Sequence, residues 1–162
     1  MQHVLVVDRQ PRLRRLVQDA LERTGEYRVS CAATGEHAVP VLDFDRPSLV
    51  VLDIKMNGMP GIELAAHATQ RDIPIIVTTD EAEMDGRLSR LGWPCVVKPI
   101  RTELLLDECR VTIAQTQASL CIVRASLERL LSTTGDVRDL VAKLDTLRTR
   151  LRSILEASRR LH

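Results

Sequence analysis

Four short apolar runs in this chain each end in a polar residue, and that repeated pattern restricts the fold more than any other feature. The residues at the ends are Asp8, Asp53, Thr79 and Lys98, each after a run rich in Val, Leu or Ile. Segments with helical periodicity separate the runs, which predicts a parallel sheet covered by helices on both faces. Ligands of such sheets bind outside the carboxyl ends of the strands, so we expect these four side chains to converge. Two carboxylates, a hydroxyl and an ammonium suit a phosphoryl group and a divalent cation.

The order of the elements follows from periodicity and from residues typical of helix and strand ends. Strands are predicted at 3–8, 28–33, 48–53, 73–79 and 95–97, and helices at 11–24, 35–44, 61–70 and 81–91. Thr34 is the expected N-cap of the second helix. Pro40 lies inside that helix, where its missing N–H and its ring predict a kink or an early end. The alternation of strand and helix is complete by residue 98.

From residue 102 onward the sequence becomes almost continuously helical. Apolar residues recur at heptad spacing on either side of a Gly-containing interruption at 132–136, which predicts a helical hairpin. The second helix carries the clearer seam, formed by Val137, Leu140, Leu144, Leu147, Leu151 and Ile154. We therefore divide the chain into residues 1–102 and 103–162. Two helices would leave each seam half covered, so we expect a four-helix homodimer, with packing within one chain as the alternative.

Composition excludes several classes of protein. The formal charge of +1 provides no general attraction to nucleic acid or to anionic lipid, and one Trp, one Tyr and one Phe provide no base-stacking platform. The four cysteines lie singly in apolar runs without metal-ligand spacing. The chain enters the first predicted strand at once, so we expect no signal peptide, and no apolar run approaches 18 residues. We expect a cytoplasmic protein that neither spans nor binds a membrane.

The ordered set Val-Val-Asp, Leu-Asp, Val-Thr-Thr and Val-Lys-Pro resembles the receiver domain of bacterial two-component response regulators, over about residues 1–118. The resemblance implies a flavodoxin-like (βα)5 sheet. It also implies that Asp53 accepts a phosphoryl group from a phosphohistidine on a sensor histidine kinase or phosphotransfer protein. Thr79, the switch residue, and Lys98 would bind the phosphoryl oxygens, and the bond from Lys98 to Pro99 would be cis.

One departure from the family concerns the metal site. Receivers usually carry two adjacent acids after the first strand, whereas this chain has Asp8 followed by Arg9. Mg²⁺ would be left with Asp8, Asp53 and the backbone carbonyl of Lys55. At separations of about 4 Å each unit charge is worth about 4 kcal/mol at an intermediate dielectric constant, so we expect weak binding. Arg9 either forks onto Asp53 in place of the cation or points to solvent.

Other departures concern the switch and the attacking water. Asp80 follows the switch threonine where the family has a small residue, and its charge would repel a phosphoryl group. Cys95 stands where an aromatic residue normally couples the switch to the surface, so ring rotation cannot operate. Lys55 and Glu81 lie at the two places that flank the path of the attacking water in the family, and an ion pair between them would cover it.

Three functions remain in competition at the level of sequence. The first is an atypical phosphorylatable regulator whose output passes through the dimeric helices, with no enzymatic or DNA-binding output domain and with an unidentified protein target. The second is a pseudo-receiver that acts as a dimeric adapter without phosphorylation. The third, nucleic-acid binding, rests on basic residues near the end, Arg148, Arg150, Arg152, Arg159 and Arg160. It is disfavoured because charge runs of this kind usually form a solvated face.

Overall fold

A computed structural model describes residues 1–80, 88, 91–133 and 141–149 of the chain. The chain divides into two compact units, Met1–Ile113 and Ala114–His162. The first unit contains the whole sheet, and with it the four strand ends whose polar residues are predicted to form a site.

The first unit is built on a five-stranded, entirely parallel sheet with the order β2-β1-β3-β4-β5. The strands are β1 (Gln2–Val7), β2 (Tyr27–Ala32), β3 (Leu49–Asp53), β4 (Ile75–Thr79) and β5 (Cys95–Val97). The predicted doubly wound sheet is therefore confirmed. In the register Asp53 pairs with Thr78 and Thr79 with Val97, so the carboxyl ends of neighbouring strands meet at one edge of the sheet.

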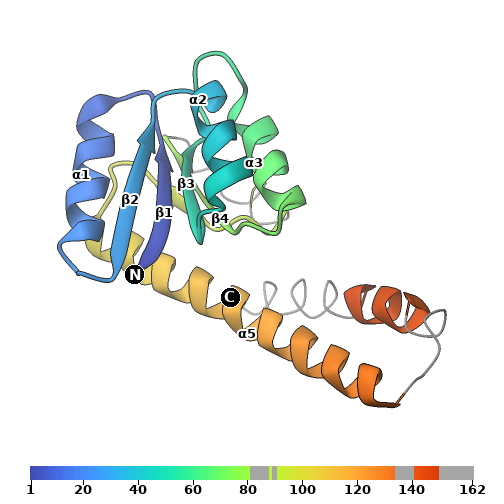
Figure 1. Ribbon diagram of the computed structural model, residues 1–162. Coiled ribbons are helices and arrows are strands. Elements are labelled where there is room, and N and C mark those ends of the chain that lie inside the picture. Colours follow the sequence, from blue (N-terminus) through green and yellow to red (C-terminus); the bar gives the residue numbers. More distant parts are fainter. Residues whose placement is uncertain (81–87, 89–90, 134–140, 150–162) are drawn as a thin grey trace. The chain divides into compact units, whose positions relative to one another are not determined.

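Helices cover both faces of this sheet (Figure 1). They are α1 (Pro11–Glu22), α2 (Gly35–Pro40), a π-helix η1 (Val41–Asp45), α3 (Gly61–Gln70) and the long α5 (Thr102–Thr133). One apolar cluster joins α2, η1 and α3 to the sheet through residues that include Leu42 and Leu64. A second cluster on the other face joins α1 and the start of α5, with Val17 and Leu105 fully covered.

The second helix ends where the sequence predicts a break. Thr34 caps it as expected, accepting the N–H of His37 at 3.4 Å. At Pro40 the α-helix stops, because proline has no N–H to donate and its ring clashes with the preceding turn. The chain then continues as the wider π-helix and leaves it through Arg46, whose φ of 43° is left-handed. Of the predicted helix at 81–91, only Leu88 and Leu91 lie within the described residues.

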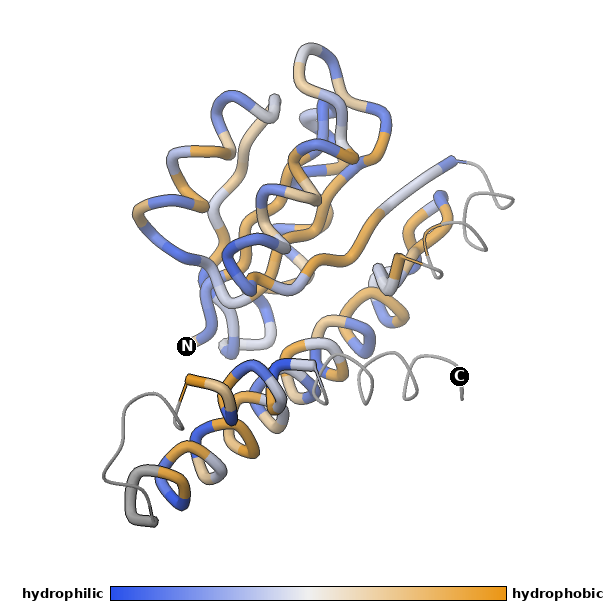
Figure 2. Tube along the Cα trace, turned by 90° about the vertical axis from the view of Figure 1, so that its right-hand side faces the viewer, coloured by the Kyte–Doolittle hydropathy of each residue, from blue (hydrophilic) through white to orange (hydrophobic). Residues whose placement is uncertain are grey.

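The second unit contains the rest of α5 and a helix at residues 141–149. Apolar and polar residues alternate along α5 (Figure 2), and Val123 and Leu127 are half-buried whereas Leu120 is exposed. Leu144 and Leu147 of the predicted seam are half-buried. The other seam residues, Val137, Leu140, Leu151 and Ile154, lie outside the described residues. Among the described helices, none is both long enough and apolar enough to cross a lipid bilayer.

His3 is a buried titratable residue of β1. Its Nε2 lies 2.8 Å from the Ser30 hydroxyl, while its Nδ1 is buried without a hydrogen-bond partner. Burial, together with the nearby Arg28, lowers the pKa of His3, against a smaller opposing effect of Asp45. The folded protein therefore prefers the neutral imidazole.

This preference predicts a loss of stability in mild acid. Because the unfolded chain protonates first, the contribution of His3 is complete above its unfolded pKa of about 6.5 and is lost as the pH falls below it. The free energy of unfolding, measured by urea titration across this pH range, should fall more steeply in the wild type than in His3→Gln. Parallel pH profiles in the two proteins would contradict the assignment.

Candidate functional site

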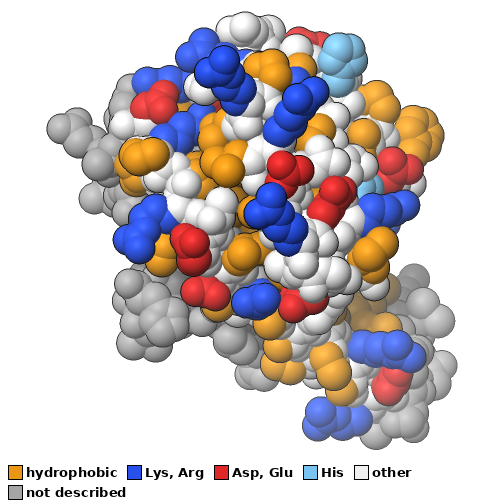
Figure 3. All heavy atoms as spheres, turned by 90° about the vertical axis from the view of Figure 1, so that its left-hand side faces the viewer, with side chains coloured by type: hydrophobic (Ala, Val, Ile, Leu, Met, Phe, Trp, Pro, Cys, Tyr) orange, Lys and Arg blue, Asp and Glu red, His pale blue; other side chains and the backbone are white. Residues whose placement is uncertain are grey.

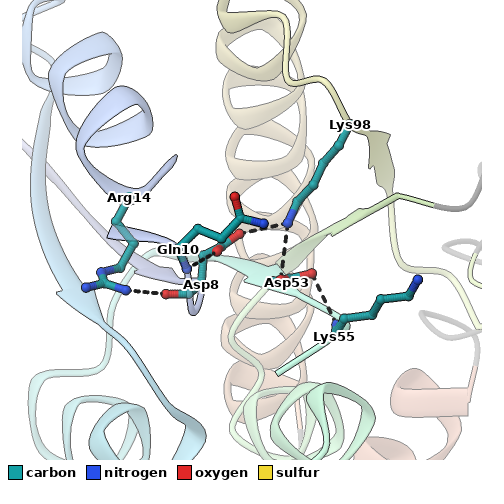
Figure 4. A network of polar contacts seen from close by, with 6 residues as sticks. All are labelled: Asp8, Gln10, Arg14, Asp53, Lys55 and Lys98. Atoms are coloured by element: carbon teal, nitrogen blue, oxygen red, sulfur yellow. Dashed lines mark hydrogen bonds and ion pairs between the residues drawn. The ribbon is translucent and has the colours of Figure 1, made fainter. Parts of the chain in front are cut away.

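The structure brings Asp8, Asp53 and Lys98 together at the carboxyl edge of the sheet. The Lys98 ammonium lies 2.9 Å from Asp8 Oδ2 and 3.1 Å from Asp53 Oδ2, so a single cation bridges the two carboxylates (Figure 4). Their side chains are only 9%, 4% and 3% exposed, in the order Lys98, Asp8, Asp53. The convergence expected from the strand ends is present for these three side chains.

Both aspartates are oriented in the same way. The Gln10 N–H donates to Asp8 Oδ1 at 2.7 Å, and the Lys55 N–H donates to Asp53 Oδ1 at 3.1 Å. In each case the carboxylate binds the backbone two residues further on, which is the local turn that aspartate favours at the start of a loop. The second oxygen of each is thereby directed at Lys98 (Figure 4).

The backbone around the site is also fixed. Arg14 of α1 donates from Nη1 to the Asp8 carbonyl at 2.5 Å. The Lys98 N–H donates to the Thr79 carbonyl at 2.7 Å, which ties the end of β5 to the end of β4. Thr79 itself is fully buried, and the Lys98–Pro99 peptide bond is cis.

Charge and burial act against each other in this site. Burial raises the pKa of Asp53, as does the charge of Asp8, whereas the Lys55 N–H and the Lys98 ammonium lower it by less. For Lys98 burial alone would lower the pKa, but its hydrogen bond to Asp8 and the charges of Asp8 and Asp53 together raise it. The lysine thus stays charged, and Asp53 becomes a more basic carboxylate than an exposed aspartate.

The remaining predicted residues lie at the periphery. Arg9 is exposed and, among the described residues, has no hydrogen-bond or ion-pair partner, so its side chain takes the solvent-facing placement rather than forking onto Asp53. It lines an open hollow with Gln10, Pro11, Arg12 and Asn57.

The other residues predicted to modulate the site are Asp80, Lys55, Cys95 and Glu81. Asp80 and Lys55 are exposed, and Cys95 is half-buried at the start of β5. Glu81 lies outside the described residues.

The residues of the site fit a magnesium ion in chemistry but not in number. Carboxylate oxygens of Asp8 and Asp53 and the carbonyl of Lys55 are the hard donors that Mg²⁺ prefers, and water would have to complete the octahedron. Within the described part of the chain no three acidic, His or Cys side chains are grouped to hold a metal. Lys98 competes for the same carboxylate oxygens, and Arg9 adds a positive charge to the rim.

Three residues of this region could not be recognised from the sequence. Gln10 acts through its backbone N–H, Arg14 reaches back from α1, and Glu36 contacts the loop after β3 from α2. The only available signal was the helical spacing that directs Arg14 towards the end of β1. No pattern in the sequence connects Glu36 with a loop more than twenty residues away.

Comparison with known proteins agrees with this geometry. The chain matches the response regulator receiver domain family over residues 4–110, and it belongs to that family. The resemblance found in the sequence is therefore confirmed. Within the family, receiver domains are the phosphoryl-accepting modules of two-component signal transduction.

Individual relatives give the extent of the similarity. The positive alginate biosynthesis regulatory protein of Pseudomonas aeruginosa is 34% identical over 112 residues, which cover 65% of this chain and 44% of that protein. Sporulation initiation phosphotransferase F of Bacillus subtilis is 34% identical over 60% of this chain and 86% of its own length. Chemotaxis protein CheY4 of Vibrio cholerae superposes with a TM-score of 0.61 at 28% identity, over 69% of this chain and 98% of that structure. The chain spans about half the length of several curated relatives, among them the probable transcriptional regulator ycf27 of Cyanophora paradoxa.

Proposed function

We propose that this receiver accepts a phosphoryl group on Asp53 from a phosphohistidine of a sensor histidine kinase or phosphotransfer protein. The observation that carries the proposal is a buried carboxylate at a strand end with the Lys98 ammonium 3.1 Å away. Covalent catalysis by a carboxylate requires a positioned nucleophile and a positive charge beside the transferred group. The raised pKa of Asp53 supports the same role, because a more basic carboxylate is the better nucleophile.

The chemistry is a displacement at phosphorus. A carboxylate oxygen of Asp53 forms a new bond to phosphorus while the bond from phosphorus to the donor imidazole nitrogen breaks. The bonding electron pair stays on that nitrogen, and the product is an acyl phosphate on Asp53. Lys98 stabilises negative charge on the phosphoryl oxygens, and in this proposal Thr79 binds one of them.

Magnesium in this site would neutralise phosphoryl charge, held by Asp8, Asp53 and the Lys55 carbonyl. Asp8, Asp53 and Lys98 together carry a formal charge of −1, and this net charge is what would attract the magnesium ion. Arg9 stands where a second acid would contribute another negative charge. Weak binding of magnesium is therefore part of the proposal.

The proposed output is a protein–protein interaction of the C-terminal helices. The apolar seam at heptad spacing supports association of two copies through residues 103–161. Leu144 and Leu147 of this seam are only half-buried within one copy, which leaves part of each side chain for a partner to cover. Since Cys95 replaces the aromatic residue of the usual switch, a signal from Asp53 would have to reach α5 by another route. In the first unit α5 is packed into the core through Leu105, Cys109 and Ile113, which provides a direct connection.

A second candidate is an adapter that works without phosphorylation. It is favoured by Arg9, which replaces an acidic metal ligand, and by Lys98, which already bridges both carboxylates. Nucleic-acid binding has less support, because a run of basic residues of this kind usually forms a solvated face and the whole chain has a formal charge of only +1.

Incubation with a small acyl phosphate or phosphoramidate and Mg²⁺ tests the main proposal. Intact mass should increase by one phosphoryl group in the wild type and not in Asp53→Asn, which keeps the shape of the side chain but not its nucleophile. Absence of the added mass, in wild type and in Arg9→Asp alike, would favour the adapter.

Replacement of Arg9 tests the charge argument. Arg9→Asp removes a cation and restores an acidic pair, so it should tighten Mg²⁺ binding, measured by titration calorimetry, by about tenfold or more. Arg12→Asp is the matched control, because it makes the same charge change further along the hollow. Equal affinities in wild type and Arg9→Asp would refute the argument.

The dimer is tested by charging its seam. Leu144→Glu combined with Leu147→Glu places two carboxylates among apolar side chains, so the doubled mass expected of the wild type in light scattering should return to the monomer mass of 18.2 kDa. Thr146→Glu combined with Thr149→Glu adds the same charge to exposed positions of this helix and should leave the dimer intact. A wild type that is monomeric at micromolar concentration would rule the dimer out.

A further inference from the structure

The loop that follows the proposed phosphoacceptor, residues 54–60, is anchored at both of its ends. At the start, the Ile54 N–H donates to the Thr78 carbonyl at 3.0 Å and the Lys55 N–H donates to Asp53 Oδ1. At the end, Gly61 packs so closely that a Cβ on it would lie 2.8 Å from the Asp53 carbonyl oxygen. Any change in the path of this loop therefore reaches Asp53 directly.

The last part of the loop is held by the first turn of α2. Glu36 Oε1 accepts the N–H of Met59 at 2.9 Å, across 23 positions of sequence. Two glycines permit this approach. Gly58 has a φ of +77°, and a Cβ there would lie 2.6 Å from Glu36 Oε1, while a Cβ on Gly35 would lie 2.8 Å from Met59 Cβ.

The Glu36 carboxylate is built into this contact. Hydrogen bonds from its own backbone N–H, from the Thr34 hydroxyl and from the Met59 N–H lower its pKa and so favour the ionised carboxylate. Its side chain is exposed and belongs to neither apolar cluster. A role in building the core does not account for the contact, whereas a role in holding the loop does.

We propose that Glu36 is a positioning residue for Asp53: by holding the Met59 N–H it fixes the path of residues 54–60, and through the Lys55 N–H it fixes the orientation of the Asp53 carboxylate. This inference rests on the proposed phosphoacceptor role of Asp53. It adds a polar connection from α2 to the acceptor that the phosphoryl-binding residues do not supply. Glu36 itself contacts neither Asp53 nor the transferred group.

Three variants separate this role from a general effect on stability. Glu36→Ala removes the acceptor for the Met59 N–H, whereas Glu36→Gln keeps a carbonyl oxygen of similar reach. Glu63→Ala is the matched control, since Glu63 is another exposed glutamate in the first turn of a helix, at the start of α3. Circular dichroism and thermal unfolding verify that all the proteins fold.

Two measurements are made on each variant. Hydrogen exchange followed by mass spectrometry reports protection of the peptide containing residues 54–60, and intact mass reports the rate of phosphorylation by a small acyl phosphate. In Glu36→Ala, loss of one hydrogen bond should speed exchange in this peptide and slow phosphorylation, each by about fivefold. Glu36→Gln should stay within about twofold of the wild type in both measurements, and so should Glu63→Ala.

Several results would overturn the proposal. They are unchanged exchange in Glu36→Ala, faster exchange without slower phosphorylation, and a Glu36→Gln protein that behaves like Glu36→Ala. If the wild type itself takes no phosphoryl group, the proposed function fails, and Glu36 is then judged by exchange and by the carboxyl ¹³C resonance of Asp53. A resonance that shifts in Glu36→Ala, and not in Glu36→Gln, supports positioning, and an unmoved resonance refutes it.

Discussion

The Lys98 ammonium, held between two buried carboxylates, is the interaction on which the rest of the site depends. Asp8 and Asp53 end neighbouring strands and are almost fully covered, so without a cation their charges would repel each other in a medium of low dielectric constant. Lys98 supplies that cation from the far edge strand. The sheet order β2-β1-β3-β4-β5 brings the ends of β1, β3 and β5 close enough for this contact.

The surroundings of this ion cluster serve mainly to orient it. One carboxylate oxygen of each aspartate binds a backbone N–H two residues further on, which leaves the other for Lys98.

Away from this ion cluster the surface is mixed in charge. Figure 3 looks on the side where α1 lies and shows Lys and Arg side chains interspersed with acidic and apolar ones. This face therefore carries no uniform field that would select a strongly charged partner.

The sequence predicts most of the fold because the strands and their ends obey simple rules. Apolar runs ending in Asp8, Asp53 and Lys98 specify a parallel sheet and its ligand edge, and Pro40 specifies the break after α2. Continuation of the chain as a π-helix, with Leu42 buried in the core, could not be predicted, because no pattern in the sequence distinguishes a π-helix from an α-helix. The direction of the Arg9 side chain and the contact between Glu36 and Met59 could not be predicted from the sequence either, because both depend on the three-dimensional course of loops.

The central claim is that Asp53 is a buried carboxylate whose charge is maintained by Lys98. Titration of the Asp53 carboxyl by ¹³C NMR, in the wild type and in Lys98→Met, tests this most directly. Because burial outweighs the stabilising contacts, the pKa of Asp53 should lie above its ordinary value in the wild type, and it should rise further when the ammonium is removed. A pKa at or below the ordinary value in the wild type, or one unchanged by Lys98→Met, would contradict the account.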